Sequence, residues 1–122
     1  MGIVVNYKIN AYSHLIFIFL TSMTAASRKQ QGEIGVAVIG TGFGKKVHIP
    51  GLKAHPRTKI AAVYNRDLDK AKEIAESNDI PHACDNLTDI LQLPEVKAVA
   101  ISTPPFLHYE MAKQVLEAGN HV

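Results

Sequence analysis

Three glycines stand at alternate positions, Gly40, Gly42 and Gly44, directly after an apolar run at residues 34–39. When such a run forms a strand, the first glycine permits a sharp turn and the second lets a phosphate group come close to the backbone. The helix that follows begins with unpaired amides and the positive end of its dipole, which favours an anion. The spacing therefore predicts a pyrophosphate-binding turn, with candidate contacts at Gly40, Thr41, Gly42, Phe43, Gly44 and Lys45.

Lys45 stands where the dinucleotide-binding pattern G-x-G-x-x-G has its third glycine. That glycine normally lets the helix pack closely on the sheet. We expect either a slightly displaced helix or a turn in which Gly44 takes over the close packing. The three glycines also satisfy G-x-G-x-G, a pattern of S-adenosylmethionine-dependent methyltransferases, so two enzyme classes remain open at this point.

The residues at the end of the second apolar run, 59–65, distinguish between the ligands of these classes. A methyltransferase or an NAD-selective dehydrogenase has an acidic residue there to accept hydrogen bonds from the ribose hydroxyls. This sequence has Asn65 and Arg66 instead. A guanidinium pairs well with a phosphate, and the missing carboxylate removes a repulsion that a 2′-phosphate would meet, which favours NADP over NAD. Two alternatives stay open for Asp67: its carboxylate turns toward the ribose, or Arg66 and Asp67 merely begin the next helix.

The composition gives little support for a metal site, for cysteine chemistry or for nucleic-acid binding. The six histidines show no H-x-H or H-x-x-x-H spacing, so we expect no metal site. Cys84 is the single cysteine, which excludes an internal disulfide and fits buried packing better than nucleophilic catalysis. The net charge is only +2, and the basic residues are scattered, so we expect no nucleic-acid partner.

Strand and helix patterns alternate strictly from residue 34 onward. Expected strands are 34–39, 59–65, 81–85 and 96–103, and expected helical segments are 45–54, 67–78, 87–91 and a helix that starts at Pro104–Pro105 and ends at Gly119. A further strand begins at 120–122. Such alternation requires right-handed crossovers and a parallel sheet covered on both faces. The predicted fold class is α/β, a Rossmann-type doubly wound parallel sheet that is incomplete at its C-terminal edge.

The first 33 residues differ from this pattern and are expected to form an N-terminal extension to a domain at 34–122. The extension contains the apolar run LIFIFL (15–20), which is too short to span a bilayer. Residues 1–22 are interpreted as an upstream stretch translated ahead of a natural start at Met23, the extension is expected to be disordered, and the protein is expected to be cytoplasmic. The alternative is a leader or membrane anchor formed by residues 1–26.

Three segments of the chain resemble one family: VAVIGTGFGKKVHIPGL, AAVYNRDLDKAKEIAE and VKAVAISTPPFLHYEMAKQVLEAGNHV. The chain is similar to the N-terminal NAD(P)-binding Rossmann domain of the glucose-fructose oxidoreductase / inositol dehydrogenase (Gfo/Idh/MocA) oxidoreductases. This resemblance implies that Gly40, Gly42, Phe43 and Gly44 line the pyrophosphate and that Asn65 and Arg66 meet the adenosine ribose. It also places Ser102, Thr103, Pro104 and His108 near the nicotinamide ribose.

The resemblance further implies an enzyme that transfers hydride between a nicotinamide dinucleotide and a sugar, polyol or related carbonyl substrate, with a homo-oligomeric full-length protein. In this family an E-K-P segment with the proton-transfer lysine follows A-G-K-H-V, whereas the present chain stops at Val122. We therefore expect a truncated protein without the C-terminal substrate domain, no catalytic residue beyond an assisting His108, and no turnover by this chain alone. A stand-alone nucleotide-sensing module and, third, a methyltransferase remain as alternatives.

Overall fold

A computed structural model describes residues 32–122 of the chain. The expected N-terminal extension, with its apolar run and both alternatives for its role, lies outside these residues except for Gly32 and Glu33. Within residues 32–122, no helix combines the length and the apolar character needed to cross a membrane.

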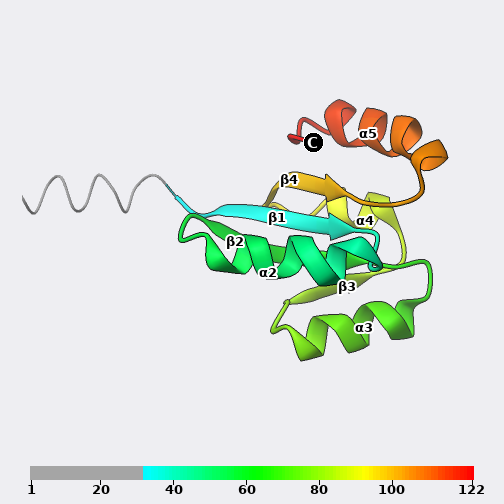
Figure 1. Ribbon diagram of the computed structural model, residues 1–122. Helices are drawn as coiled ribbons and strands as arrows, with labels where there is room; N and C mark the ends of the chain where they lie inside the picture. Colours follow the sequence, from blue (N-terminus) through cyan, green and yellow to red (C-terminus); the bar gives the residue numbers. More distant parts are fainter. Residues whose placement is uncertain (1–31) are drawn as a thin grey trace, which may run out of the picture. The chain divides into compact units, whose positions relative to one another are not determined.

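Strands and helices alternate along the described chain, as the sequence predicts (Figure 1). The elements are β1 (Ile34–Ile39), a π-helical turn η1 (Gly44–His48), α2 (Ile49–Ala54), β2 (Thr58–Tyr64), α3 (Leu68–Ser77), β3 (His82–Cys84), α4 (Leu87–Leu91), β4 (Val96–Ile101), a 3₁₀ turn η2 (Pro105–Leu107) and α5 (His108–Glu117).

The four strands form one parallel sheet in the order β3-β2-β1-β4. β1 pairs with β2 on one side and with β4 on the other side. Ile39, the last residue of β1, lies beside Tyr64 of β2 and Ile101 of β4. The order of the strands therefore reverses between β1 and β4. In open α/β sheets, ligands bind at the carboxyl ends of the strands next to such a reversal.

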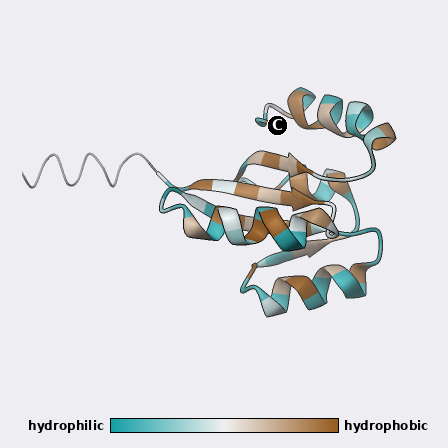
Figure 2. Ribbon diagram, in the orientation of Figure 1, coloured by the Kyte–Doolittle hydropathy of each residue, from teal (hydrophilic) through white to brown (hydrophobic). Residues whose placement is uncertain are grey.

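Helices cover both faces of this sheet (Figure 1). Val38 of β1 belongs to a buried cluster with residues of α2 and α3, whereas its neighbours Ala37 and Ile39 belong to a second cluster with residues of α4 and α5. The strands are accordingly apolar along most of their length (Figure 2), which is typical of a sheet buried on both faces. The doubly wound α/β fold is thus confirmed.

The helix expected at 45–54 is interrupted by the wider turn η1. In this turn the Ile49 backbone N–H donates to the Gly44 carbonyl, five residues earlier. Pro50 follows immediately, and proline within a helix has no N–H and crowds the carbonyl four residues before it. A π turn relieves this crowding because it widens the helix locally.

The end of the chain begins to pair with the outer edge of β4. The Val99 N–H donates to the His121 carbonyl at 2.9 Å, and the His121 N–H donates to the Lys97 carbonyl at 3.0 Å. A single parallel bridge, Ala98 to His121, results. The fifth strand expected from residue 120 is therefore present only as this bridge.

Asp79 ends α3 in a conformation that suits glycine better. Its φ is +55°, and the Asp79 and Ile80 N–H groups donate to the carbonyls of Glu76 and Ala75 in the manner of a Schellman motif. Left-handed backbone is costly for a residue with a side chain.

We expect Asp79→Gly to raise the free energy of unfolding by about 0.5–1 kcal/mol, because glycine adopts this backbone conformation without strain. The measurement is urea denaturation. Asp79→Ala keeps the strained φ without the charge and should not stabilise; equal stabilisation by both variants would assign the effect to the charge.

Candidate functional site

A pocket of about 440 Å³ opens at the carboxyl ends of β1, β2 and β4. Its walls come from the turn after β1, the end of β2, the segment after β4 and the first turns of α5. The lining residues are Gly40, Thr41, Gly42, Tyr64, Asn65, Arg66, Ser102, Thr103, Pro104, Phe106, Leu107 and Met111. The pocket thus lies at the strand-order reversal and contains most of the site residues expected from the sequence.

Gly40 and Ser102 join the ends of β1 and β4 beneath this pocket. Gly40 has a φ of +95°, and a Cβ atom placed on it would lie 2.6 Å from the Ser102 carbonyl carbon. The Ser102 N–H donates to the Ile39 carbonyl at 2.8 Å, and the Ser102 hydroxyl donates to the Gly40 carbonyl at 2.9 Å. Only glycine fits this position, because both the backbone conformation and the lack of space exclude a side chain.

Gly42 and Gly44 have opposite surroundings. A Cβ atom on Gly42 would meet no protein atom within 4 Å, whereas one on Gly44 would lie 2.8 Å from Val38 Cγ1 and 3.1 Å from Ser102 Oγ. Lys45 is exposed. Of the two alternatives for the missing third glycine, the structure shows the second: Gly44 provides the close approach of the helical segment to the sheet, so a lysine is tolerated at position 45.

The end of β2 contributes a hydrogen-bonded group of side chains. The Asn65 side-chain amide donates to Thr41 Oγ1 at 2.5 Å, and its Oδ1 accepts the Asp67 N–H at 2.9 Å. The Asp67 carboxylate caps α3 by accepting the N–H groups of Asp69 and Lys70. Because its carboxylate caps the helix and does not line the pocket, Asp67 follows the second of its two alternatives, as a helix-starting residue.

Arg66, by contrast, does line the pocket, together with Asn65. No aspartate or glutamate is among the lining residues of the described chain. The pocket therefore carries a net positive charge, which suits an anionic ligand.

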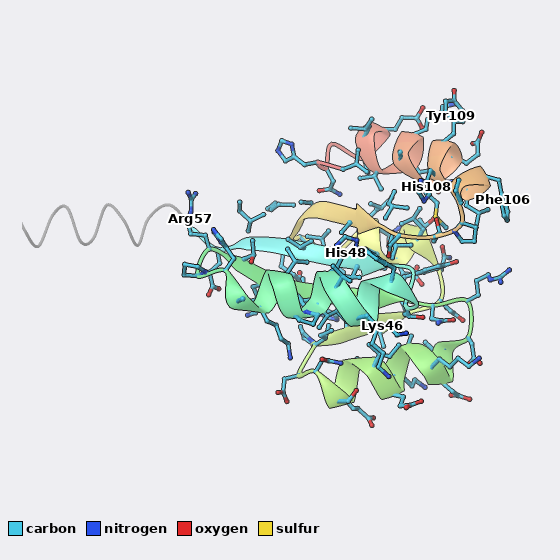
Figure 3. All side chains as sticks on the ribbon, viewed as in Figure 1. Lys46, His48, Arg57, Phe106, His108 and Tyr109 are labelled. Carbon is cyan, nitrogen blue, oxygen red and sulfur yellow. The ribbon has the colours of Figure 1, made fainter. Side chains whose placement is uncertain are left out.

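Four expected site residues lie elsewhere. Phe43, Gly44 and Lys45 are in the glycine turn but do not line the pocket, and His108 lines a separate hollow of about 430 Å³ with His48, beside the outer edge of β4. Figure 3 shows His48 at η1 and His108 at the start of α5. His108 Nε2 lies 2.6 Å from the Thr103 carbonyl, so the histidine holds the segment that follows β4.

Four lining residues were not expected from the sequence: Tyr64, Phe106, Leu107 and Met111. Tyr64 is the last residue of β2, next to Asn65. Leu107 ends η2, and Met111 lies four residues later in the first turn of α5; apolar residues at this spacing are a signal that the sequence offers. Phe106 is 80% exposed although it lines the pocket, and its side chain projects from the start of α5 in Figure 3.

Two groups outside the pocket have shifted pKa values. Burial, with a contribution from the carboxylates of Asp89 and Asp85, raises the pKa of the Cys84 thiol. The pKa of Glu95 is lowered by hydrogen bonding from its own backbone N–H and by His82, whose Nε2 lies 2.6 Å from the carboxylate. Among residues 32–122, no three histidine, cysteine or acidic side chains are grouped so as to hold a metal ion.

Comparison with known proteins identifies the family to which the chain belongs. Residues 34–122 match the family described as "Oxidoreductase family, NAD-binding Rossmann fold", Gfo/Idh/MocA. An uncharacterized oxidoreductase of Synechocystis sp., sll0816, is 60% identical over 87 residues, which are 71% of this chain and 24% of that protein. The 4-carboxy-2-hydroxymuconate-6-semialdehyde dehydrogenase of Sphingobium sp. is 34% identical over 88 residues, 71% of this chain and 28% of that protein.

Solved structures give the same result. GenD2 from gentamicin A biosynthesis, in complex with NAD, is 32% identical with a TM-score of 0.68, over 73% of this chain and 25% of GenD2. KijD10, a 3-ketoreductase from Actinomadura kijaniata in complex with NADP, is 32% identical with a TM-score of 0.70, over 75% of this chain and 29% of KijD10.

The chain spans about a quarter of the length of the curated relatives it matches. The matches support the nicotinamide-dependent oxidoreductase interpretation over the methyltransferase and nucleotide-sensing alternatives. The family resemblance inferred from the sequence is confirmed: the chain belongs to the Gfo/Idh/MocA oxidoreductase family and contains its NAD(P)-binding Rossmann fold at residues 34–122.

Proposed function

We propose that residues 34–122 bind NADP(H) in preference to NAD(H), as the cofactor-binding part of an oxidoreductase acting on a CH–OH group of a sugar, polyol or related substrate. The family is NAD-binding, and its solved structures include complexes with NAD and with NADP. The observation that supports NADP is the charge of the pocket: Arg66 lines it, and no aspartate or glutamate among the described residues does. A 2′-phosphate would meet a guanidinium and no carboxylate there.

The residues of the pocket fit a dinucleotide. The open space beside Gly42 leaves room for a pyrophosphate against the backbone. We assign Arg66 to the 2′-phosphate, and the apolar side chains of Phe106, Leu107 and Met111 to contact with the adenosine half. The exposed Lys45 and Lys46 on η1 add positive charge near the turn.

When bound, the nicotinamide supplies a hydride donor or acceptor at its C4 atom. The contribution of the described residues is to hold and orient the dinucleotide, because no histidine, lysine, cysteine or carboxylate among them lines the pocket. A hydride transfer to a carbonyl also needs a proton donor in reach of the substrate oxygen. We therefore expect residues 33–122, purified alone, to bind NADPH without catalysing substrate turnover; steady dehydrogenase activity of this segment would contradict the proposal.

The test of cofactor preference follows the fluorescence of NADPH and of NADH as each binds to the protein. We expect tighter binding of NADPH, and a loss of about tenfold or more for NADPH on Arg66→Ala, with NADH affected by less than about twofold. Arg57→Ala serves as the control, since Arg57 is exposed in the turn before β2 and does not line the pocket (Figure 3). Equal affinity of the unaltered protein for both cofactors would contradict the NADP preference.

A further inference from the structure

Thr41 and Asn65 make a side-chain contact between the glycine turn and the end of β2. We infer that Asn65 is a positioning residue, which orients the Thr41 hydroxyl so that its proton is donated to the pyrophosphate of a bound dinucleotide. This inference rests on the proposed function, and it differs from the direct ribose contact that the family resemblance implies for Asn65.

The orientation of the Asn65 amide is determined by its neighbours. Its Oδ1 accepts the backbone N–H of Asp67 at 2.9 Å, so the donating Nδ2 end of the amide faces Thr41. The Asn65 backbone N–H also donates to the Cys84 carbonyl at 3.1 Å, which fixes this residue to β3. Asn65 is therefore held at its backbone and at its side-chain oxygen, and it presents a hydrogen to Thr41 Oγ1.

The Thr41 hydroxyl consequently acts as an acceptor toward Asn65 at 2.5 Å. A hydroxyl carries one proton and can accept and donate at the same time. Among residues 32–122, the Thr41 hydroxyl accepts this one hydrogen bond and donates none, and Thr41 lines the pocket between Gly40 and Gly42. A phosphate oxygen in the turn is an acceptor that would complete the network, and the bond would be strengthened by the charge of the phosphate.

A direct contact between Asn65 and the ribose would have to use the second hydrogen of the side-chain amide or the second lone pair of its oxygen. Its oxygen and one of its two amide hydrogens are already used within the protein. The route through Thr41 uses the contact that exists, and it predicts that the effects of the two residues depend on each other.

The test is a double-mutant cycle with Thr41→Val, Asn65→Leu and the double variant in the full chain. Binding of two ligands is measured by calorimetry: NADPH, which contains the pyrophosphate, and adenosine 2′-monophosphate, which lacks it. We expect each single variant to weaken NADPH binding by about tenfold. We expect the double variant to lose little more than either single variant, because both remove the same hydrogen bond to phosphate.

Adenosine 2′-monophosphate should bind all variants within about twofold of the unaltered protein, because only the pyrophosphate contact is lost. Thr41→Ser, which restores the hydroxyl, should keep NADPH binding within about threefold. Thr88→Val on α4 is the matched control, since Thr88 is exposed and outside the pocket.

Different failures have different meanings. Additive losses for NADPH, or unchanged affinity in Thr41→Val, would overturn the positioning role. Equal losses for both ligands with a lower melting temperature would show that Asn65 and Thr41 only stabilise the fold, and would also overturn it. If the unaltered protein bound neither NADPH nor NADH, the proposed function itself would fail.

Discussion

Replacement of Gly42 by alanine should weaken NADPH binding by about tenfold or more while the melting temperature of the free protein changes little. A Cβ atom at position 42 meets no protein atom within 4 Å, and the φ of Gly42 is not in the left-handed region. The methyl group therefore costs the free fold little, but it occupies the space through which a pyrophosphate approaches the backbone. Fluorescence titration with NADPH, together with a thermal melt, measures both quantities on one preparation.

Gly51→Ala is the matched control for this experiment. A Cβ atom on Gly51 also meets nothing within 4 Å, but Gly51 lies in α2, away from the pocket. Alanine there should be neutral or stabilising by up to about 1 kcal/mol, because glycine is a poor helix former. If Gly42→Ala bound NADPH as tightly as Gly51→Ala, the pyrophosphate would not lie against Gly42, and the assignment of the glycine turn would be wrong.

The parts of the fold that depend on short-range patterns were predictable from the sequence. Apolar runs without polar alternation indicated strands buried on both faces, and Gly119, with a φ of +82°, ends α5 as expected. The π turn at Gly44–His48 was not predicted, although Pro50, which follows it closely, stands in the sequence. Proline signals that a regular helix is disturbed, but the choice among a kink, a break and a wider turn depends on how the segment packs on the sheet.

The candidate site was predictable where one segment supplies it and not where segments meet. The glycine turn follows from local spacing, whereas the hydrogen bond from Asn65 to Thr41 joins residues 24 positions apart. The role of Gly44 depends on Val38 and on Ser102, and Ser102 lies 58 residues further along the chain. Such contacts arise from the order of strands in the sheet, which the sequence pattern limits but does not specify by residue.

Replacement of Gly40 by alanine should destabilise the protein by about 2–5 kcal/mol. Two independent causes combine at this residue. Its φ of +95° is unfavourable for a residue with a side chain, and the added Cβ would lie 2.6 Å from the carbonyl carbon and 2.7 Å from the carbonyl oxygen of Ser102. These are backbone atoms next to the paired ends of β1 and β4, where Ile39 and Ile101 are neighbours, so relief requires the two strands to separate. For a domain of this size, the change corresponds to a fall in melting temperature of roughly 10 °C or more.

Gly119→Ala separates the two causes. Gly119 has a similar φ of +82°, but a Cβ atom there meets nothing within 4 Å, so this variant shows the cost of the backbone conformation alone, about 1–2 kcal/mol. The excess loss in Gly40→Ala, measured by urea denaturation of both variants without cofactor, then gives the contribution of the close contact between β1 and β4. Equal losses in the two variants would mean that the strand ends at the pocket move apart easily. In that case Gly40 would be needed for its backbone conformation and not for the close packing at the strand-order reversal.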